Sequence, residues 1–167
     1  MSAGRGLLLI AALSLPGAAA ANDDRASYAI GGKHFDRNDV PTFQIDPDGN
    51  ADWFTATGFQ AYHQLCRNCH GPKGSGSEYG AALVDPERKL QYFDFTDIVV
   101  NGQIVQSGGN ARVMPAFGTN PEVMCRLDAI YIYLRAETAG ALDGKPPVQS
   151  VAASKEPAIE LDDCLLR

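Results

Sequence analysis

The chain has 167 residues and a mass of 17.8 kDa, which suits one domain, and its formal charge is −6 at pH 7. No apolar run reaches the roughly 18 residues that a membrane span needs, and 20 Asp and Glu against 14 Lys and Arg exclude the basic composition of a protein that binds nucleic acid or anionic lipid. The sequence therefore predicts a single soluble acidic domain without a nucleic-acid partner or a membrane span in its mature chain.

Residues 1–21 have the layout of a secretory signal peptide. Arg5 is followed by a short apolar run over residues 7–13 and by small residues at 18–21. This order is typical of a cleaved signal, and the apolar run is too short to anchor a protein across a bilayer. We expect cleavage near Ala21 and export to the periplasm, where disulfides form and persist.

The next residues, 22–51, show no sustained helical or strand period. They contain scattered aromatic residues, two prolines and an Asp48-Gly49 turn signal, which together indicate an extended, irregular N-terminal arm. Helical spacing begins after Asp52, a suitable N-cap residue. The apolar stripe of this first helix falls at i, i+3, i+7 and i+10, on Phe59, Tyr62, Cys66 and Cys69.

Two further helices follow along the chain. A short one is indicated by Phe95, Ile98 and Val99, and it stops at Asn101-Gly102; residues 107–110 are expected to form a loop. In the last helix Asn120 can cap, Pro121 suits the first position, and apolar residues recur at helical spacing as far as Leu134. Without strand patterns, the economical architecture is an all-α domain of three to five short helices over residues 52–138, followed by an irregular tail over residues 139–167.

Residues 66–70 read Cys-Arg-Asn-Cys-His, the C-x-x-C-H pattern of covalent c-type haem attachment. Two thiols at this spacing reach the two vinyl groups of the porphyrin, and His70 is left to offer a ring nitrogen to the iron. A redox pair or a zinc ribbon lacks its usual sequence context here, and a Cys66–Cys69 disulfide leaves His70 unexplained. We therefore predict one covalent haem c, attached through Cys66 and Cys69, with His70 as an axial ligand.

The candidates for the second axial ligand are Met114, Met124, His34 and His63. Met114 is favoured, because it follows a Gly-rich loop and precedes Pro115, so the chain can carry it across the haem. Met124 lies in the first turn of the last helix, where core packing is the usual role, and His63 is tied to the proximal side. A bis-histidine site through His34 and an open distal site remain alternatives.

The distal ligand bears directly on function. A thioether favours the ferrous state, and a six-coordinate iron leaves no position for a substrate. A Met114 ligand therefore predicts an electron carrier and not an enzyme, whereas an open site would suit a haem enzyme or a ligand-binding haem protein.

Several motifs over residues 52–138 resemble a class I cytochrome c. They are Phe59, the Cys66–His70 motif with the following Gly71-Pro72, the Met114-Pro115 pair, and the aromatic last helix with Tyr133. The resemblance implies that the first and last helices cross beside the haem. It also implies that Gly58 or Phe59 meets Ile130 and Tyr133.

Two additional cysteines extend the resemblance to a particular group of c-type cytochromes. Cys125, Cys164 and the Met-Pro-Ala-Phe-Gly sequence at 114–118 resemble the four-cysteine c-type cytochromes associated with methanol metabolism. These are relatives of the cytochromes that serve quinoprotein alcohol dehydrogenases. The resemblance implies a carrier that takes electrons from a PQQ-dependent methanol or alcohol dehydrogenase and passes them to a downstream cytochrome c or oxidase. We expect Cys125 and Cys164 to pair and to tether the tail to the last helix; an intermolecular disulfide is the alternative.

The acidic excess lies outside the segment that should surround the haem. Residues 66–115 are neutral overall, whereas residues 22–65 carry −4 and residues 116–167 carry −3. We hypothesise that acidic flanks steer a partner toward a nearly neutral haem rim, as suits a small and transient redox encounter.

Overall fold

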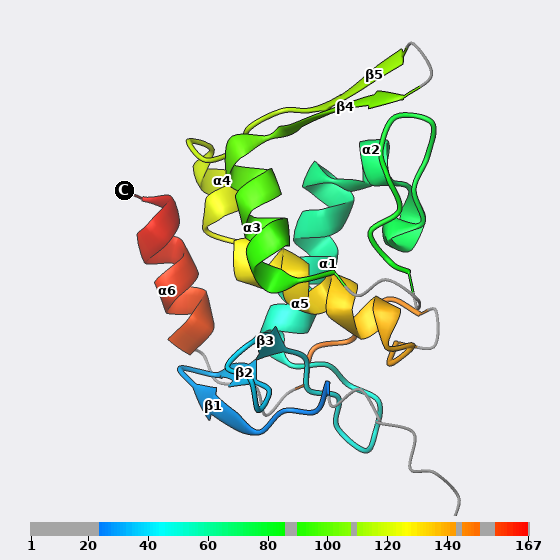
Figure 1. Cartoon of the computed structure of the whole chain (residues 1–167). Helices are drawn as coiled ribbons and strands as arrows, with labels where there is room; N and C mark the ends of the chain where they lie inside the picture. The colour runs from blue at the N-terminus through cyan, green and yellow to red at the C-terminus, as the bar shows by residue number, and fades with distance from the viewer. Residues whose placement is uncertain (1–23, 86–89, 108–109, 143–144, 151–155, 167) are drawn as a thin grey trace, which may run out of the picture.

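A computed structural model describes residues 24–85, 90–107, 110–142, 145–150 and 156–166 (Figure 1). The predicted signal peptide, residues 1–21, lies outside the described residues. The helical elements are α1 (Trp53–Leu65), α2 (Arg67–His70), the 3₁₀ turn η1 (Pro72–Gly74), α3 (Tyr92–Asn101), α4 (Pro121–Met124), α5 (Leu127–Thr138) and α6 (Glu156–Leu165). The strands are β1 (Tyr28–Ile30), β2 (Lys33–Phe35), β3 (Pro41–Thr42), β4 (Gln103–Ser107) and β5 (Asn110–Met114). Among the described helices, none is both long enough and apolar enough to span a bilayer.

Helices α1 and α5 pack against each other at the centre of the molecule (Figure 1). Asp52 caps α1, since its carboxylate accepts hydrogen bonds from the Thr55 amide at 3.1 Å and the Thr55 hydroxyl at 2.5 Å. The rings of Phe59 and Tyr133 meet edge to face with centroids 5.6 Å apart. This contact confirms the Tyr133 part of the prediction that Gly58 or Phe59 meets Ile130 and Tyr133.

Gly58 permits the close approach of α1 to α5. A Cβ atom at Gly58 would lie 1.8 Å from the carbonyl oxygen of Ala129 and 2.9 Å from the Cβ of Tyr133. The backbone of α5 cannot move aside as a flexible side chain could, so any larger residue must push the two helices apart.

We expect Gly58→Ala to lower the free energy of unfolding by about 3 kcal/mol, the upper end of ordinary overpacking costs. Guanidinium unfolding of the haem-loaded protein measures the change. The neighbouring Thr57→Ala is the matched control and should change stability by less than about 1 kcal/mol. Equal losses in the two variants would show that the helix crossing does not depend on glycine.

The prediction of an all-α fold is wrong, because the structure contains two antiparallel sheets. One sheet has the order β1-β2-β3 and lies in the arm predicted to be irregular; the other is the β4-β5 hairpin. Gly31 and Gly32 join β1 to β2, and both have positive φ, which the tight two-residue hairpin turn requires. The tail is not wholly irregular either, since α6 forms there.

Arg135 of α5 holds the N-terminal sheet against the helices. Its guanidinium pairs with the carboxylates of Asp24 at 2.8 Å and Asp36 at 2.5 Å, and it donates to the Pro41 carbonyl at 2.9 Å. Burial alone would raise the pKa of Asp36, but hydrogen bonds from Arg135 and from the amides of residues 38 and 40 outweigh it and lower that pKa. The short strands are therefore stabilised by a partly buried ion-pair cluster as well as by their own ladder.

Candidate haem-binding site

The two cysteines of the C-x-x-C-H motif lie where α1 passes into α2. Cys66 is partly buried at the junction, Cys69 is exposed, and both thiols are unpaired in the structure. Burial, together with the nearby Cys69, raises the pKa of the Cys66 thiol to about 11. A redox-active C-x-x-C pair needs a lowered thiol pKa. Cys66 therefore lacks the lowered pKa of an attacking thiol, and its position at an apolar cavity is compatible with covalent attachment of haem.

His70 and Met114 line the same cavity, although 43 intervening residues separate them in sequence. The cavity holds about 560 Å³ of empty space, including its open mouth. Its lining is otherwise apolar apart from the Cys66 thiol and consists of Leu65, Leu83, Leu90, Phe95, Ile98, Val99, Phe117, Val123, Leu127, Ile130 and Leu134. The Cys66 thiol, an imidazole and a thioether line apolar walls, and the exposed Cys69 thiol follows three residues after Cys66 without lining the cavity itself. Together they are the side chains that a covalent haem c needs. These residues therefore fit the group.

The ring of His70 is oriented by the loop that follows α2. Its Nδ1 atom lies 2.9 Å from the carbonyl oxygen of Ala81. Because a carbonyl can only accept, Nδ1 carries the proton and Nε2 keeps a free lone pair for a metal. Gly71, with φ of 73°, turns the chain sharply after His70, so the loop can return over the ring.

Met114 is carried to the cavity by the β4-β5 hairpin. It is the last residue of β5 and pairs with Gln103. At the base of the hairpin, a Cβ on Gly102 would lie 2.7 Å from the Met114 carbonyl oxygen. Beyond Met114, the amide of Phe117 donates to the Val99 carbonyl at 2.9 Å. These close backbone contacts fix the segment that holds Met114 against the end of α3.

The other candidate ligands lie elsewhere. His34 is in β2, paired with Ala29 and Thr42. His63 is on α1, where its Nδ1 contacts the Phe59 carbonyl at 2.9 Å. Met124 packs against the core from α4 and lines a different cleft. Of the four side chains considered for the second axial position, only Met114 lines the cavity with His70.

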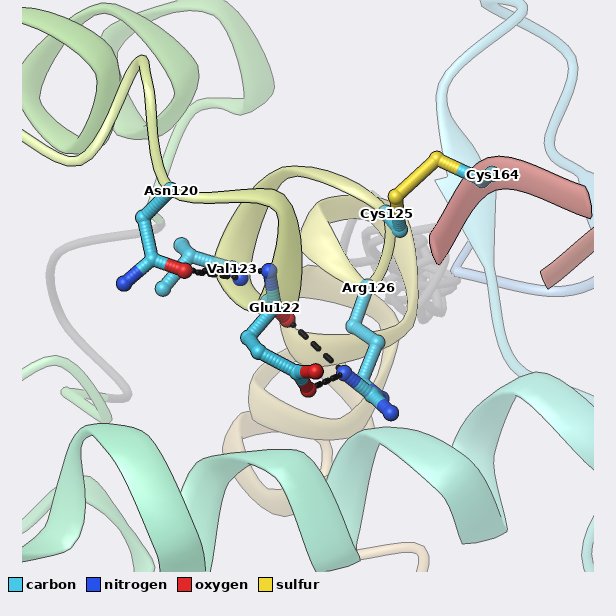
Figure 2. Close-up of a disulfide and its surroundings, with 6 residues drawn as sticks. All are labelled: Asn120, Glu122, Val123, Cys125, Arg126 and Cys164. Carbon is cyan, nitrogen blue, oxygen red and sulfur yellow. Dashed lines mark hydrogen bonds and ion pairs between the residues drawn. A yellow bond between two sulfur atoms is a disulfide. The ribbon is translucent and has the colours of Figure 1, made fainter. Parts of the chain in front are cut away.

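The structure joins Cys125 to Cys164 in a disulfide with a Cα–Cα distance of 5.8 Å (Figure 2). Cys125 is the C-cap of α4, a turn whose N-cap Asn120 accepts hydrogen bonds from the amides of Glu122 and Val123. Cys164 lies in α6, so the bond connects the C-terminal tail to the end of α4. Neither cysteine lines the cavity of His70 and Met114.

Two features of the site were not predicted from the sequence: the Ala81 carbonyl, which accepts from the His70 ring, and the β4-β5 hairpin, which carries Met114. A backbone acceptor leaves no trace in the sequence, because any residue type could supply it. The hairpin did have a signal, since Gly108-Gly109, which lie outside the described residues, stand between two runs that contain β-branched residues.

Comparison with known proteins identifies the family. Residues 54–134 match the family described as "Cytochrome C oxidase, cbb3-type, subunit III". Cytochrome c-553I of Paracoccus denitrificans is 39% identical over 135 residues, which cover 80% of this chain and 59% of that protein. Cytochrome c-555 of Methylococcus capsulatus is 29% identical over 92 residues, which cover 54% of this chain and 68% of that protein. The chain thus spans less than two thirds of the length of cytochrome c-553I.

A solved structure supports the same assignment. The crystal structure of the c-type cytochrome XoxG from Methylobacterium extorquens AM1 superposes with a TM-score of 0.73 and 40% identity, over 83% of this chain and 85% of that one. These matches confirm the predicted resemblance and the haem c cofactor, and they agree with the assignment as an electron carrier, since each relative is named a cytochrome. The chain belongs to the class I c-type cytochromes.

Proposed function

We propose that this monohaem electron carrier works in the periplasm, where it accepts single electrons from a PQQ-dependent methanol or alcohol dehydrogenase. It passes them to a downstream cytochrome c or oxidase. The observation that carries the proposal is the convergence of His70 and Met114 on one apolar cavity next to Cys66. The dehydrogenase as donor is supported by the resemblance of residues 114–118 and of the additional cysteine pair to the cytochromes of methanol metabolism.

Each residue of the site has a distinct role in this proposal. Cys66 and Cys69 would attach the haem, and His70 and Met114 would bind its iron. When bound, the haem supplies a one-electron ferric/ferrous couple. The apolar walls exclude water, and the Ala81 carbonyl holds the His70 ring in one orientation. With His70 and Met114 both bound to the iron, the site would exchange electrons and would offer no place for a substrate.

Stopped-flow absorbance tests the donor. The periplasmically matured cytochrome is mixed with the quinoprotein methanol dehydrogenase of the same cell, with and without methanol. We expect reduced haem bands to appear rapidly and only when methanol is present. The starting spectrum tests attachment, because a variant with alanine at Cys66 and Cys69 should carry no covalent haem. A haem that dithionite reduces but the dehydrogenase does not would contradict the proposed donor.

The β4-β5 hairpin offers a docking face for that donor. It projects from the end of α3 (Figure 1), and the cross-strand neighbours Ile104 and Val113 are 67% and 61% exposed. Arg112 is the only charged residue of the two strands. Two strands of five residues each form a small face, which suits a transient redox complex and not a stable dimer. Two copies of a chain with net charge −6 also repel each other. We therefore assign the hairpin to the dehydrogenase, whose facing surface should be apolar with a carboxylate near Arg112.

Replacing both Ile104 and Val113 with serine should lower the second-order rate constant for reduction by the dehydrogenase about ten-fold, the effect expected when about 1.4 kcal/mol of docking free energy is lost. Reduction by ascorbate and the reduction potential should stay unchanged, because neither side chain lines the cavity. Ile30→Ser, on the equally exposed β1, is the control and should leave the rate unaltered. A wild-type rate in the double variant would place docking elsewhere.

A further inference from the structure

The loop after α2 satisfies the carbonyl groups that the end of this helix leaves open. The last carbonyls of a helix have no partner within it. Here the Arg67 carbonyl accepts from the Gly71 amide at 2.9 Å, and the His70 carbonyl accepts from the Gly76 amide at 2.7 Å. Of the two carbonyls between them, that of Cys69 accepts from a side chain: the hydroxyl of Ser77, at 2.5 Å.

The same hydroxyl also organises its own turn. The Ser77 Oγ accepts from the Tyr79 amide at 3.0 Å and from the Gly80 amide at 3.4 Å, and the Ser77 amide donates to the Gly80 carbonyl at 2.9 Å. The residue that follows this closed turn is Ala81, whose carbonyl accepts the Nδ1 proton of His70. One hydroxyl thus connects the peptide before His70 with the turn that presents the acceptor for the His70 ring.

The turn over residues 77–80 packs closely against His70. A Cβ atom on Gly80 would lie 2.6 Å from the Cys69 carbonyl oxygen and 3.1 Å from His70 Nδ1. Glycine at this position therefore lets the turn approach the ring, and the Ser77 hydroxyl fastens it there.

We propose that Ser77 is a positioning residue for His70. Its hydroxyl holds residues 77–80 so that the Ala81 carbonyl stays in hydrogen-bonding reach of Nδ1. This bond makes the imidazole a stronger electron donor to a bound metal and thereby favours the ferric state. Loss of the hydroxyl loosens the bond and raises the reduction potential. The inference rests on the proposed role of His70 as an axial ligand.

The test compares Ser77→Ala with Ser77→Thr, which keeps a hydroxyl, and with Ser75→Ala, an exposed serine of the same loop whose hydroxyl takes no part in these contacts. Spectroelectrochemical titration gives the ratio of ferrous to ferric haem at one applied potential. We expect Ser77→Ala to raise this ratio at least about three-fold, as suits partial loss of one hydrogen bond to the ligand. Ser77→Thr and Ser75→Ala should stay near the wild-type ratio.

Nuclear magnetic resonance of the ferrous protein, with nitrogen-15 in its histidines, provides a second measurement. In Ser77→Ala the Nδ1 proton of His70 should exchange with water faster than in the wild type. An unchanged ratio together with an unchanged exchange rate would overturn the proposal, even if stability fell. If Ser77→Ala does not mature, Ser77→Val, which has the shape of threonine without its hydroxyl, is measured in its place against Ser77→Thr. Ring nitrogens of His70 without hyperfine shifts in the ferric wild type would instead refute the axial role itself.

Discussion

Replacing Met114 with alanine is expected to lower the reduction potential of the haem on the order of 0.2 V, because the axial ligands set the potential over a range of about 0.8 V. A thioether stabilises ferrous iron, and alanine has no atom that can coordinate. Among the other side chains that line the cavity, only His70 and Cys66 have a nitrogen or sulfur atom that could bind a metal. The variant should therefore also bind added imidazole or cyanide, which the wild type should resist.

Spectroelectrochemistry and ligand titration measure the two effects of Met114→Ala. Met124→Ala is the matched control, since Met124 packs in the core from α4 outside this cavity, and it should leave the potential unchanged. Met114→His should lower the potential while keeping the iron closed to added ligands. A Met114→Ala variant with the wild-type potential and ligand affinity would show that the distal site is already open.

The sequence predicted best where chemistry demands a fixed spacing. Covalent attachment requires Cys66, Cys69 and His70 to stand in one short motif, so the pattern alone predicts both cofactor and chemistry. The helices α1 and α5 were predictable for a related reason, because their apolar stripes repeat at helical spacing over three turns or more. The breaks were not predicted: the structure divides the expected first helix at Cys66 into α1 and α2, and the expected last helix after Met124 into α4 and α5. The preference for Met114 came from its place between a loop and the last helix, and the structure brings it to the cavity of His70.

The sheets were missed because tertiary contacts stabilise them. Strands of two or three residues, such as β1 and β3, are too short to show a period. These strands are held in place by Arg135 of α5, which lies some 100 residues away along the chain and binds Asp24 and Asp36. Such long-range ion pairs cannot be inferred from local propensity. The Ala81 carbonyl escaped prediction for the same reason, since the loop fold and not the residue type places it near His70.

Replacing both Cys125 and Cys164 with serine is expected to lower the free energy of unfolding by about 4 kcal/mol, the loop-closure value for a bond between residues 39 apart. The bond restricts the unfolded chain, and in the folded chain it holds α6 beside α4 (Figure 2). Leu161 and Cys164 of α6 share a cleft with Trp53 and Phe54 of α1. Release of α6 should therefore also expose apolar surface of α1.

Guanidinium unfolding of the double variant, and of the wild type with reductant, should give equal losses, since both open the same bond. The reduction potential should stay unchanged in each case, because neither cysteine lines the cavity of His70 and Met114. Mass spectrometry without reductant separates the remaining possibilities: two free thiols in the wild type would contradict the bond, and a covalent dimer would make it intermolecular. A stability loss without a change in potential would mean that the tail stabilises the fold and takes no part in the redox chemistry.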